Sequence, residues 1–428
     1  MPLYPARALE RAMKIREVIT RAMSGQINWL QAAEIIGITD RSMRRWRKRL
    51  GVQGYEGLLD RRTRRPSAKR IDMATVETML KLYREKYFDL NVKHFVEKLH
   101  GPEQISLSYT WVKTALQNAG LVKRYAKRGP HRRKRPRRPL TGMMLHVDGS
   151  RHRWIPGLDQ YQDSIVIFDD ATSEVYDVQL VEEESTVTVM AALKRVVETR
   201  GLFCSLYSDR GSHMAWTPKA GEAVHPQNPT QIARALDQLG IELILAYSPQ
   251  ARGRCERLFG TWQGRLPQEL RLRHITTMEA ANEFLRQDWI GMHDASFSVK
   301  AEQAGTAFLP YPGKDLDKIF SQQHERVVDN DNTVRFECCC LQIPQQTFRF
   351  SLARCRVLVC EHLDQTISVH YGHHVLGRYD AAGQLVPLVR QSRPSRQADR
   401  RGIMKADAKR DRQSEERKKN QKRKKRAA

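Results

Sequence analysis

Hydrophobic positions in residues 6–50 recur at helical spacing, and a glycine interrupts the pattern before its last segment. In WLQAAEIIGITDRSMRRWRKRL the spacing places Leu30, Ala33 and Ile36 inward, and Gly37 breaks the helix. Thr39 or Asp40 is a suitable N-cap for the helix that follows. The pattern predicts a helix, a turn and a second helix, which is typical of helix-turn-helix DNA-binding domains. An amphipathic helix pair with a solvated basic face is the alternative.

The predicted second helix carries the strongest local sign of a nucleic-acid partner. Six basic side chains lie on it, Arg41, Arg44, Arg45, Arg47, Lys48 and Arg49. We expect a DNA-binding domain over 1–60 and a second helical domain over 70–122. The last helix of the second domain starts near Ser108 and turns Tyr109, Val112 and Leu116 inward. It is a second helix-turn-helix or another kind of three-helix domain.

Residues 123–140 link these helices to the rest of the chain. KRYAKRGPHRRKRPRRP, residues 123–139, holds ten Lys or Arg and three Pro in seventeen positions. Such a composition cannot pack a core, so we expect an extended arm that follows DNA phosphates. The candidate contacts in it are Arg132, Arg133, Lys134 and Arg135.

From residue 141 the pattern changes to strands. TGMMLHVDGSRHRW alternates, with Leu145 and Val147 on one face and His146 and Asp148 on the other. Three strands followed by helix and strand alternation predict an α/β mixed sheet over 141–300. Short strands over 320–385 predict a small antiparallel barrel or sheet. The basic segment 390–428 has no periodicity, and we expect it to be disordered until bound.

Charge divides the chain in the same way. The 428 residues have a formal net charge of +26, and the basic residues gather at the two ends around a mildly acidic middle. This charge distribution indicates that the two ends bind a polyanion, whereas the middle region has a different function. No long apolar run occurs, so we expect a cytoplasmic, nucleoid-associated protein without membrane contact. Seven Cys without a CxxC pair predict neither a disulfide framework nor a zinc module.

Three acids in the middle region are candidates for metal chemistry. Asp148 lies within the first strand, Asp209 closes the fourth, and Glu256 lies on the helix after the fifth. Acids that meet at one end of a sheet need a compensating cation, and hard oxygen ligands select Mg²⁺ or Mn²⁺. Two such ions can activate a hydroxyl for attack on phosphorus. In the alternative, Asp148 and Asp209 serve turns and Glu256 is a solvated helix residue.

The stretches HVDGS, YSDRGS and YSPQARGRCERLFGTWQGRL resemble the three motifs of DDE transposases and retroviral-type integrases. The third stretch is most similar to the ISNCY group of bacterial insertion-sequence transposases. The resemblance covers about residues 20–300 and implies an RNase H-like catalytic core. It makes Asp148, Asp209 and Glu256 the metal-binding catalytic triad, with Ser248, Pro249, Gln250 and Gly253 in the turn that aims the glutamate helix. Arg257 would contact DNA or fix that helix.

Two features depart from the resemblance. Asp209 and Glu256 are 47 positions apart, more than in a typical integrase, and the excess lies in MAWTPKAGEAVHPQNPT. That loop either contacts DNA near the cleavage site or has no role in the reaction. RGS follows Asp209 where many relatives have an Asn. Asp169 and Asp170 follow the second strand, and for these two we expect a turn role.

The expected fold is a multidomain α/β protein, with an RNase H-like core, N-terminal all-α helix-turn-helix domains and a small C-terminal β-barrel. The resemblance implies a transposase that binds terminal inverted repeats in double-stranded DNA, cleaves DNA and joins a 3′ end to a target. It also implies a homodimer or higher synaptic oligomer and two Mg²⁺ or Mn²⁺ ions. A catalytically inactive DNA-binding repressor and a metal-dependent endonuclease without joining activity are the alternatives.

Overall fold

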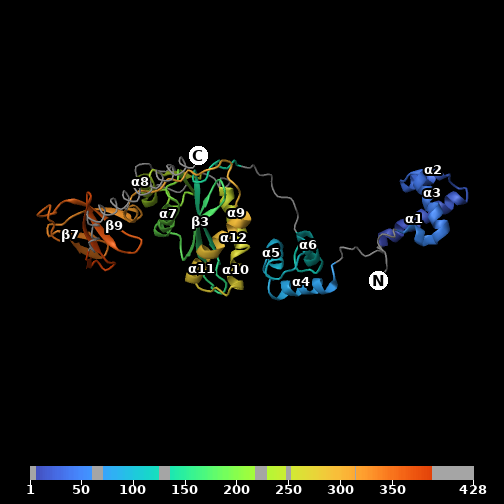
Figure 1. Cartoon of the computed structure of the whole chain (residues 1–428), viewed down its shortest axis with the longest axis horizontal. Coiled ribbons are helices and arrows are strands. Elements are labelled where there is room, and N and C mark those ends of the chain that lie inside the picture. Colours follow the sequence, from blue (N-terminus) through green and yellow to red (C-terminus); the bar gives the residue numbers. More distant parts are fainter. Residues whose placement is uncertain are drawn as a thin grey trace, which may run out of the picture. The chain divides into compact units, whose positions relative to one another are not determined.

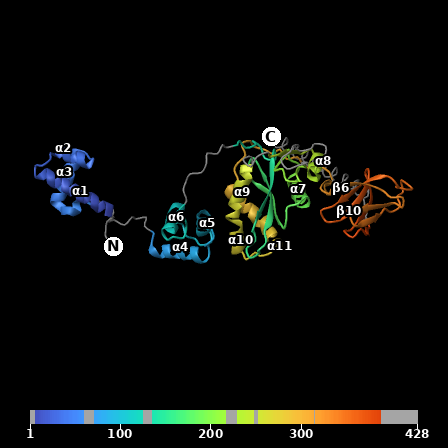
Figure 2. The same cartoon turned by 180° about the vertical axis from the view of Figure 1, so that it is seen from behind.

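A computed structural model describes residues 6–59, 71–124, 135–216, 229–246, 252–313 and 315–387. The chain divides into two compact units, one formed by residues 1–88 and 92–124 and the other by 89–91 and 125–428. Figures 1 and 2 show the elements from opposite sides. Arg132, Arg133, Lys134, Ser248, Pro249, Gln250 and the tail 390–428 lie outside the described residues.

The first unit begins with α1 (Ala6–Met23), α2 (Trp29–Ile36), α3 (Asp40–Gln53) and the short 3₁₀ helix η1 (Gly54–Leu58). Gly37 ends α2 with a φ of 72°, a left-handed conformation that glycine adopts without strain. Thr39, one of the two predicted N-caps, accepts a hydrogen bond from the Ser42 amide and starts α3. Helix, glycine turn and helix therefore follow each other as the sequence predicts.

The inward position predicted for Leu30 is wrong, because its side chain is 62% exposed. Ala33 is buried as predicted, and Ala32 is buried as well; both pack with Ile19 and Met43. Small side chains let α1, α2 and α3 approach closely, so the buried stripe of α2 is shifted from its most hydrophobic positions.

Three more helices complete this unit, α4 (Met73–Glu85), α5 (Val92–His100) and α6 (Tyr109–Asn118). Asp72 caps α4 and Ser108 caps α6, as expected near that residue. Val112 and Leu116 are buried, but Tyr109 is 42% exposed, contrary to the expectation. Tyr109 is the first residue of α6, so its side chain projects at the edge of the helix pair rather than between the helices.

The second unit is built on a five-stranded mixed sheet in the order β3-β2-β1-β4-β5. Its strands are β1 (Leu145–His152), β2 (Gln162–Asp169), β3 (Val175–Val181), β4 (Ser205–Ser208) and β5 (Glu242–Leu245). β1, β2 and β3 are antiparallel neighbours, whereas β4 runs parallel to both β1 and β5. The mixed α/β sheet predicted from the sequence is confirmed.

Helices cover both faces of this sheet, as Figures 1 and 2 show for α7 and α9 on opposite sides of β3. On one face, α7 (Thr186–Arg200) and α8 (Gln231–Gln238) pack on Leu145 and Val147. On the other lie α9 (Gly253–Gln263), α10 (Leu266–Leu272), α11 (Met278–Phe284), the π-helix η4 (Leu285–Trp289) and α12 (Ile290–Phe297). α9 ends at Gln263, where Gly264 follows it, and α10 starts at Leu266 with Pro267 in its first turn.

The C-terminal part is an antiparallel β-domain that follows the short α13 (Leu316–Ile319). One sheet has the order β12-β11-β10-β9-β6, and β7 pairs with β8. The strands are β6 (Gln322–Val327), β7 (Thr333–Phe336), β8 (Cys339–Gln342), β9 (Arg356–Glu361), β10 (Ile367–Tyr371), β11 (His374–Tyr379) and β12 (Leu385–Val386). Both sheets contribute to one core, with β6 and β12 as the edges of the larger sheet.

All seven cysteines are free thiols in this structure. Within the described residues, no helix combines the length and apolar character needed to span a membrane.

Candidate DNA interface and carboxylate site

A stripe of basic side chains runs along α3. Arg41, Arg44, Arg45 and Lys48 are exposed and follow the spacing i, i+3, i+4 and i+7, which places them on one face of the helix. With Asp40 they line a shallow hollow of about 320 Å³. Asp40 pairs with Arg44 at 2.7 Å at the start of the stripe.

Two other basic residues of α3 face elsewhere. The Arg47 guanidinium lies 4.8 Å from the centre of the Trp29 ring, and Arg49 lines a hollow beside α1. The structure therefore separates the six basic residues that the sequence grouped together. Four of them form a continuous cationic face, suited to an extended polyanion such as a DNA backbone.

The site on the mixed sheet starts from the alternation of β1. Leu145 and Val147 face α7, whereas His146 and Asp148 face α9, as the pattern predicts. Asp148 is 7% exposed, and Asp209 follows the last residue of β4. Because β1 and β4 are parallel neighbours, both carboxylates reach the same end of the sheet.

Arg252 joins these two carboxylates. Its Nη1 donates to Asp209 Oδ2 at 3.0 Å, and its Nη2 pairs closely with Asp148 Oδ1. Arg252 occupies the N-cap position of α9, so the guanidinium comes from the start of the helix that also carries Glu256. The sequence reasoning did not select Arg252, although it lies within the third motif. Its partners are 43 and 104 positions away, and no local pattern indicates such contacts.

Glu256 is exposed and lies in the first turn of α9. No hydrogen bond or ion pair joins its carboxylate to another residue that the structure describes. Across the described ranges, no group of three or more His, Cys, Asp or Glu side chains is arranged to hold a metal ion. The structure thus brings Asp148 and Asp209 together around one guanidinium and leaves Glu256 one helical turn from Arg252.

Another acid, Glu184, and a histidine, His213, lie beside Asp148 and Asp209. His213 Nε2 is 2.9 Å from Glu184 Oε1, and pairing with this carboxylate raises the pKa of His213. Asp209 raises it further through its negative charge. The Glu184 carboxylate closely approaches the α-carbon of Gly149, where a β-carbon would collide with it. Glu184 lies just before α7 in the sequence, and no local pattern indicates that its carboxylate lies beside β1.

Asp169 and Asp170 lie where β2 ends and a turn begins, but only the Asp169 carboxylate has the expected turn role. Asp169 accepts hydrogen bonds from the Gly142 amide at 2.7 Å and the Ala171 amide at 2.7 Å, and burial raises its pKa. Asp170 has a different role. It is 1% exposed and receives Arg135 at 2.8 Å, His146 at 2.7 Å and a close contact from Arg254 of α9.

This buried network ties α9 to β1. Burial, strengthened by nearby arginines, lowers the pKa of His146 to about 3, so its ring is neutral. Nε2 then donates to Asp170, and Nδ1 faces the Cys255 thiol at 3.9 Å. Burial raises the pKa of Cys255 to about 12, so the thiol keeps its proton and can donate it to Nδ1. The start of α9 is thereby held against the strand that carries Asp148.

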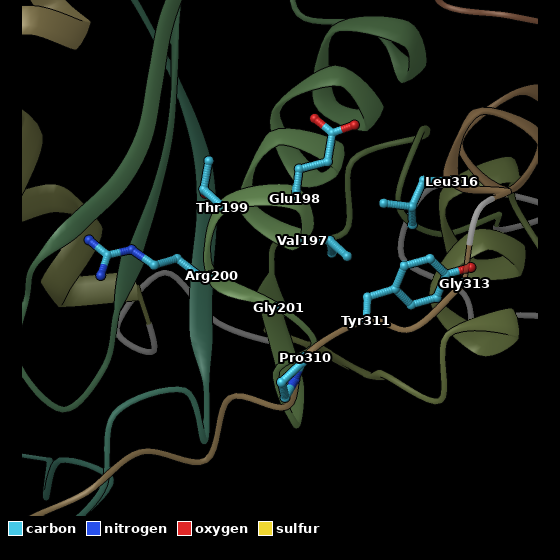
Figure 3. A pocket seen from close by; sticks show the side chains of 9 residues that line it. All are labelled: Val197, Glu198, Thr199, Arg200, Gly201, Pro310, Tyr311, Gly313 and Leu316. Atoms are coloured by element: carbon cyan, nitrogen blue, oxygen red, sulfur yellow. The ribbon is translucent and has the colours of Figure 1, made fainter. Parts of the chain in front are cut away.

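One hollow beside α7 lies away from these carboxylates. It has a volume of about 450 Å³ and lies where α7 ends, before β4 begins, whereas Asp209 follows the other end of β4. Figure 3 shows Val197, Tyr311 and Leu316 on one side of the helix, with Arg200 pointing to the other. Arg200 lies 4.7 Å from the Tyr176 ring centre. This hollow is a packing feature of the α7 end.

Comparisons with known proteins support the helix-turn-helix interpretation of the N-terminal domain. Residues 16–67 match the family described as helix-turn-helix domain. A protein of Sinorhizobium fredii that carries the provisional name transposase y4bF is 29% identical over 331 residues, covering 77% of this chain and 72% of that protein. The transposase for insertion sequence IS1202 of Streptococcus pneumoniae is 26% identical over 327 residues, covering 68% and 69%.

Among solved structures, the intasome of simian T-cell lymphotropic virus is similar with a TM-score of 0.31 and 13% identity, covering 72% of this chain and 99% of that chain. The match to residues 16–67 assigns the N-terminal domain to the helix-turn-helix class. More particularly, the chain is similar over most of its length to two bacterial proteins named as transposases, one of them for an insertion sequence.

Proposed function

We propose that this protein is a transposase that binds the terminal inverted repeats of an insertion sequence, cleaves DNA and transfers the strand to a target. The observation that carries this proposal is the meeting of Asp148 and Asp209, from two parallel strands, at one guanidinium. The chain is related to named transposases over about three quarters of its length. Its class is then a DDE-type polynucleotidyl transferase with an RNase H-like core.

The donor set fits a divalent cation. Asp148 and Asp209 already hold one cationic group between their oxygens, the guanidinium of Arg252, and carboxylates are the ligands that Mg²⁺ and Mn²⁺ prefer. We propose Glu256 as the third ligand. It lies four residues after Arg252, and residues at this spacing share one face of a helix. Two bound Mg²⁺ or Mn²⁺ ions would activate water or a DNA 3′-hydroxyl and stabilise the leaving oxygen.

The residues of the chain have distinct roles in this scheme. Asp148 is fixed by its strand, and the Asp170 network holds α9, so the glutamate helix has a defined position against β1. Arg257 is exposed next to Glu256 and is proposed to contact DNA. DNA recognition is assigned to the basic residues of α3, Arg41, Arg44, Arg45, Arg47 and Lys48, and to the arm residues Arg132, Arg133, Lys134 and Arg135.

The domain roles follow the same scheme. We propose that 1–60 and 70–122 recognise the element ends, that 123–140 follows phosphates, and that 141–300 performs the chemistry. The β-domain at 320–385, whose two sheets enclose one core, is proposed as barrel-like and as a stabiliser of the synaptic complex. Paired joining of two ends requires at least a homodimer. We expect the protein in the bacterial cytoplasm, associated with the nucleoid.

A transposition assay in cells tests the function. A marker flanked by the DNA that borders the gene on each side is supplied with wild type, Asp148→Asn, Glu256→Gln or Glu279→Gln. Glu279 is the matched control, since it is an exposed glutamate in the first turn of α11. We expect insertions with wild type and Glu279→Gln, and none with the other two variants.

Other results would favour other functions. Equal insertion by Glu256→Gln and wild type would refute the role of Glu256. Binding of the ends without any insertion, unchanged in Asp148→Asn, would favour a DNA-binding repressor. Nicked DNA without a joined product, tested with purified protein and labelled ends, would favour an endonuclease.

A further inference from the structure

The guanidinium of Arg252 uses the same oxygens that a divalent cation would need. It pairs with Asp148 Oδ1 and Asp209 Oδ2, one nitrogen to each carboxylate. Two acids on neighbouring strands repel each other, and the single positive charge between them offsets that repulsion. Because the guanidinium fork is planar and presents parallel N–H groups, one arginine can satisfy both acids at once.

The burial of the three side chains makes this pairing more than a surface ion pair. The Asp148 side chain is 6% exposed, that of Arg252 is 29% exposed, and that of Asp209 is 37% exposed. Ion pairs screened from water are stronger than exposed ones. Arginine also keeps its charge throughout the physiological pH range, so a change of pH does not release the carboxylates from it.

We propose that Arg252 is an internal competitor for the metal site. Its guanidinium holds Asp148 and Asp209 in place, and it must leave them before a divalent cation binds. This inference rests on the proposed function, since it requires those two acids to be cation ligands. Arg252 is a positioning residue in this scheme, because it acts through the two carboxylate ligands.

The position of Arg252 on α9 gives the competition a structural consequence. Arg252 occupies the N-cap position of the helix, and Glu256 lies one turn further on the same face. Release of the guanidinium frees two carboxylate oxygens at the end of the sheet while the Asp170 network still holds the next residues of the helix. Exchange of the guanidinium for a cation therefore does not require α9 to leave β1.

Cation binding can be measured without any catalytic readout. Full-length wild type, Arg252→Gln, Arg252→Lys and Arg195→Gln are titrated with Mn²⁺, and free Mn²⁺ is followed by electron paramagnetic resonance. Arg195 is the matched control because it forms a similar pair with Asp177, at 2.7 and 2.9 Å, away from the site. Asp148→Asn reports whether binding uses the proposed ligand.

If the inference is correct, Arg252→Gln binds Mn²⁺ on the order of tenfold more tightly than wild type, which corresponds to about 1.4 kcal/mol. The Mn²⁺ affinity of Arg252→Lys lies between those of wild type and Arg252→Gln, since an ammonium group cannot pair with both carboxylates as the forked guanidinium does. Arg195→Gln binds like wild type. Melting in EDTA provides the second measurement. Arg252→Gln melts below wild type in EDTA and gains more than wild type from Mn²⁺.

Equal or weaker Mn²⁺ binding by folded Arg252→Gln, with binding still abolished in Asp148→Asn, overturns the competition alone and leaves the proposed metal site standing. Mn²⁺ binding that is unaffected by Asp148→Asn, or no binding by any variant, overturns the proposed metal site and the competition together. Circular dichroism of each variant establishes that it is folded.

Discussion

Replacement of Asp170 by asparagine should destabilise the second unit by much more than an exposed charge change. Asp170 is 1% exposed, and its Oδ1 accepts from Arg135, His146 and Arg254 while Oδ2 accepts from the Arg138 amide at 2.7 Å. Asparagine removes the negative charge and offers one acceptor oxygen in place of two. The Arg254 side chain, 16% exposed, would keep its positive charge without a negatively charged partner, although its Nη2 still donates to the carbonyls of Arg135 and Pro136.

The magnitude follows from that uncompensated charge. Breaking a buried pair by removing one partner costs about 3–5 kcal/mol, because the remaining charge stays buried. For a domain of this size about 1 kcal/mol lowers Tm by roughly 2–4 °C, so the expected decrease is about 6–20 °C. Asp364→Asn is the control. Asp364 pairs with Arg378 at 3.3 Å, and their side chains are 57% and 39% exposed, so its loss should cost at most about 1 kcal/mol.

Thermal melting and urea unfolding measure the free energy, and amide hydrogen exchange shows where it acts. We expect faster exchange in α9, since Arg254 and Cys255 join the helix to this network. A double-mutant cycle with Arg254→Met should recover part of the loss, because the unpaired charge is then absent. A decrease below about 1 kcal/mol for Asp170→Asn, or unchanged exchange in α9, would refute the reasoning.

Three further predictions concern DNA, pH and the cation. Replacing any residue of the α3 stripe with glutamine should weaken DNA binding. The slope of log K for DNA binding against log salt concentration should become shallower by about 0.9 for each phosphate that is no longer neutralised. Arg16→Gln on α1 is the control and should change neither quantity, so equal effects of the two substitutions would contradict the prediction. Because the pKa of His146 is about 3 when folded and near 6.5 when unfolded, stability should fall below pH 6.5 by up to about 1.4 kcal/mol per pH unit. His146→Gln should show a shallower slope in urea titrations, and an unchanged slope would exclude His146 as the cause. Duplex DNA should increase Mn²⁺ affinity more in wild type than in Arg252→Gln, because phosphate offers the guanidinium another partner; equal increases in the Mn²⁺ titration would contradict that coupling.

The periodicity of hydrophobic residues was sufficient to predict the helices and strands and, for several of them, which residues share a face. The alternation of β1 placed Asp148 and His146 together, and this held because each strand residue points opposite to its neighbours. The buried face of α2 was predicted less well. Leucine is more hydrophobic than alanine, but Ala32 and Ala33 are buried and Leu30 is exposed, since close helix packing selects small residues.

The contacts of the site could not be predicted from spacing. Each acid could be identified as a candidate on its own, because burying a charge on a strand or at its end costs free energy unless the charge is paired. Their shared partner, Arg252, could not, since it meets Asp148 across 104 positions and only after the sheet has formed. The same is true of Arg135, which the sequence assigned to DNA and which the fold also pairs with Asp170 at 2.8 Å.

The start of α9 explains why these separate contacts form one system. Arg252 contacts Asp148 and Asp209, Arg254 contacts Asp170, and Cys255 contacts His146, so a single helical turn reaches β1, the end of β2 and the end of β4. Residues within one turn point in different directions, and this lets a short segment join three strands. The Arg254 and Cys255 contacts are enclosed, whereas those of Arg252 lie at the more open end. The first two therefore fix the helix, and only the contact of Arg252 is placed to exchange with a cation.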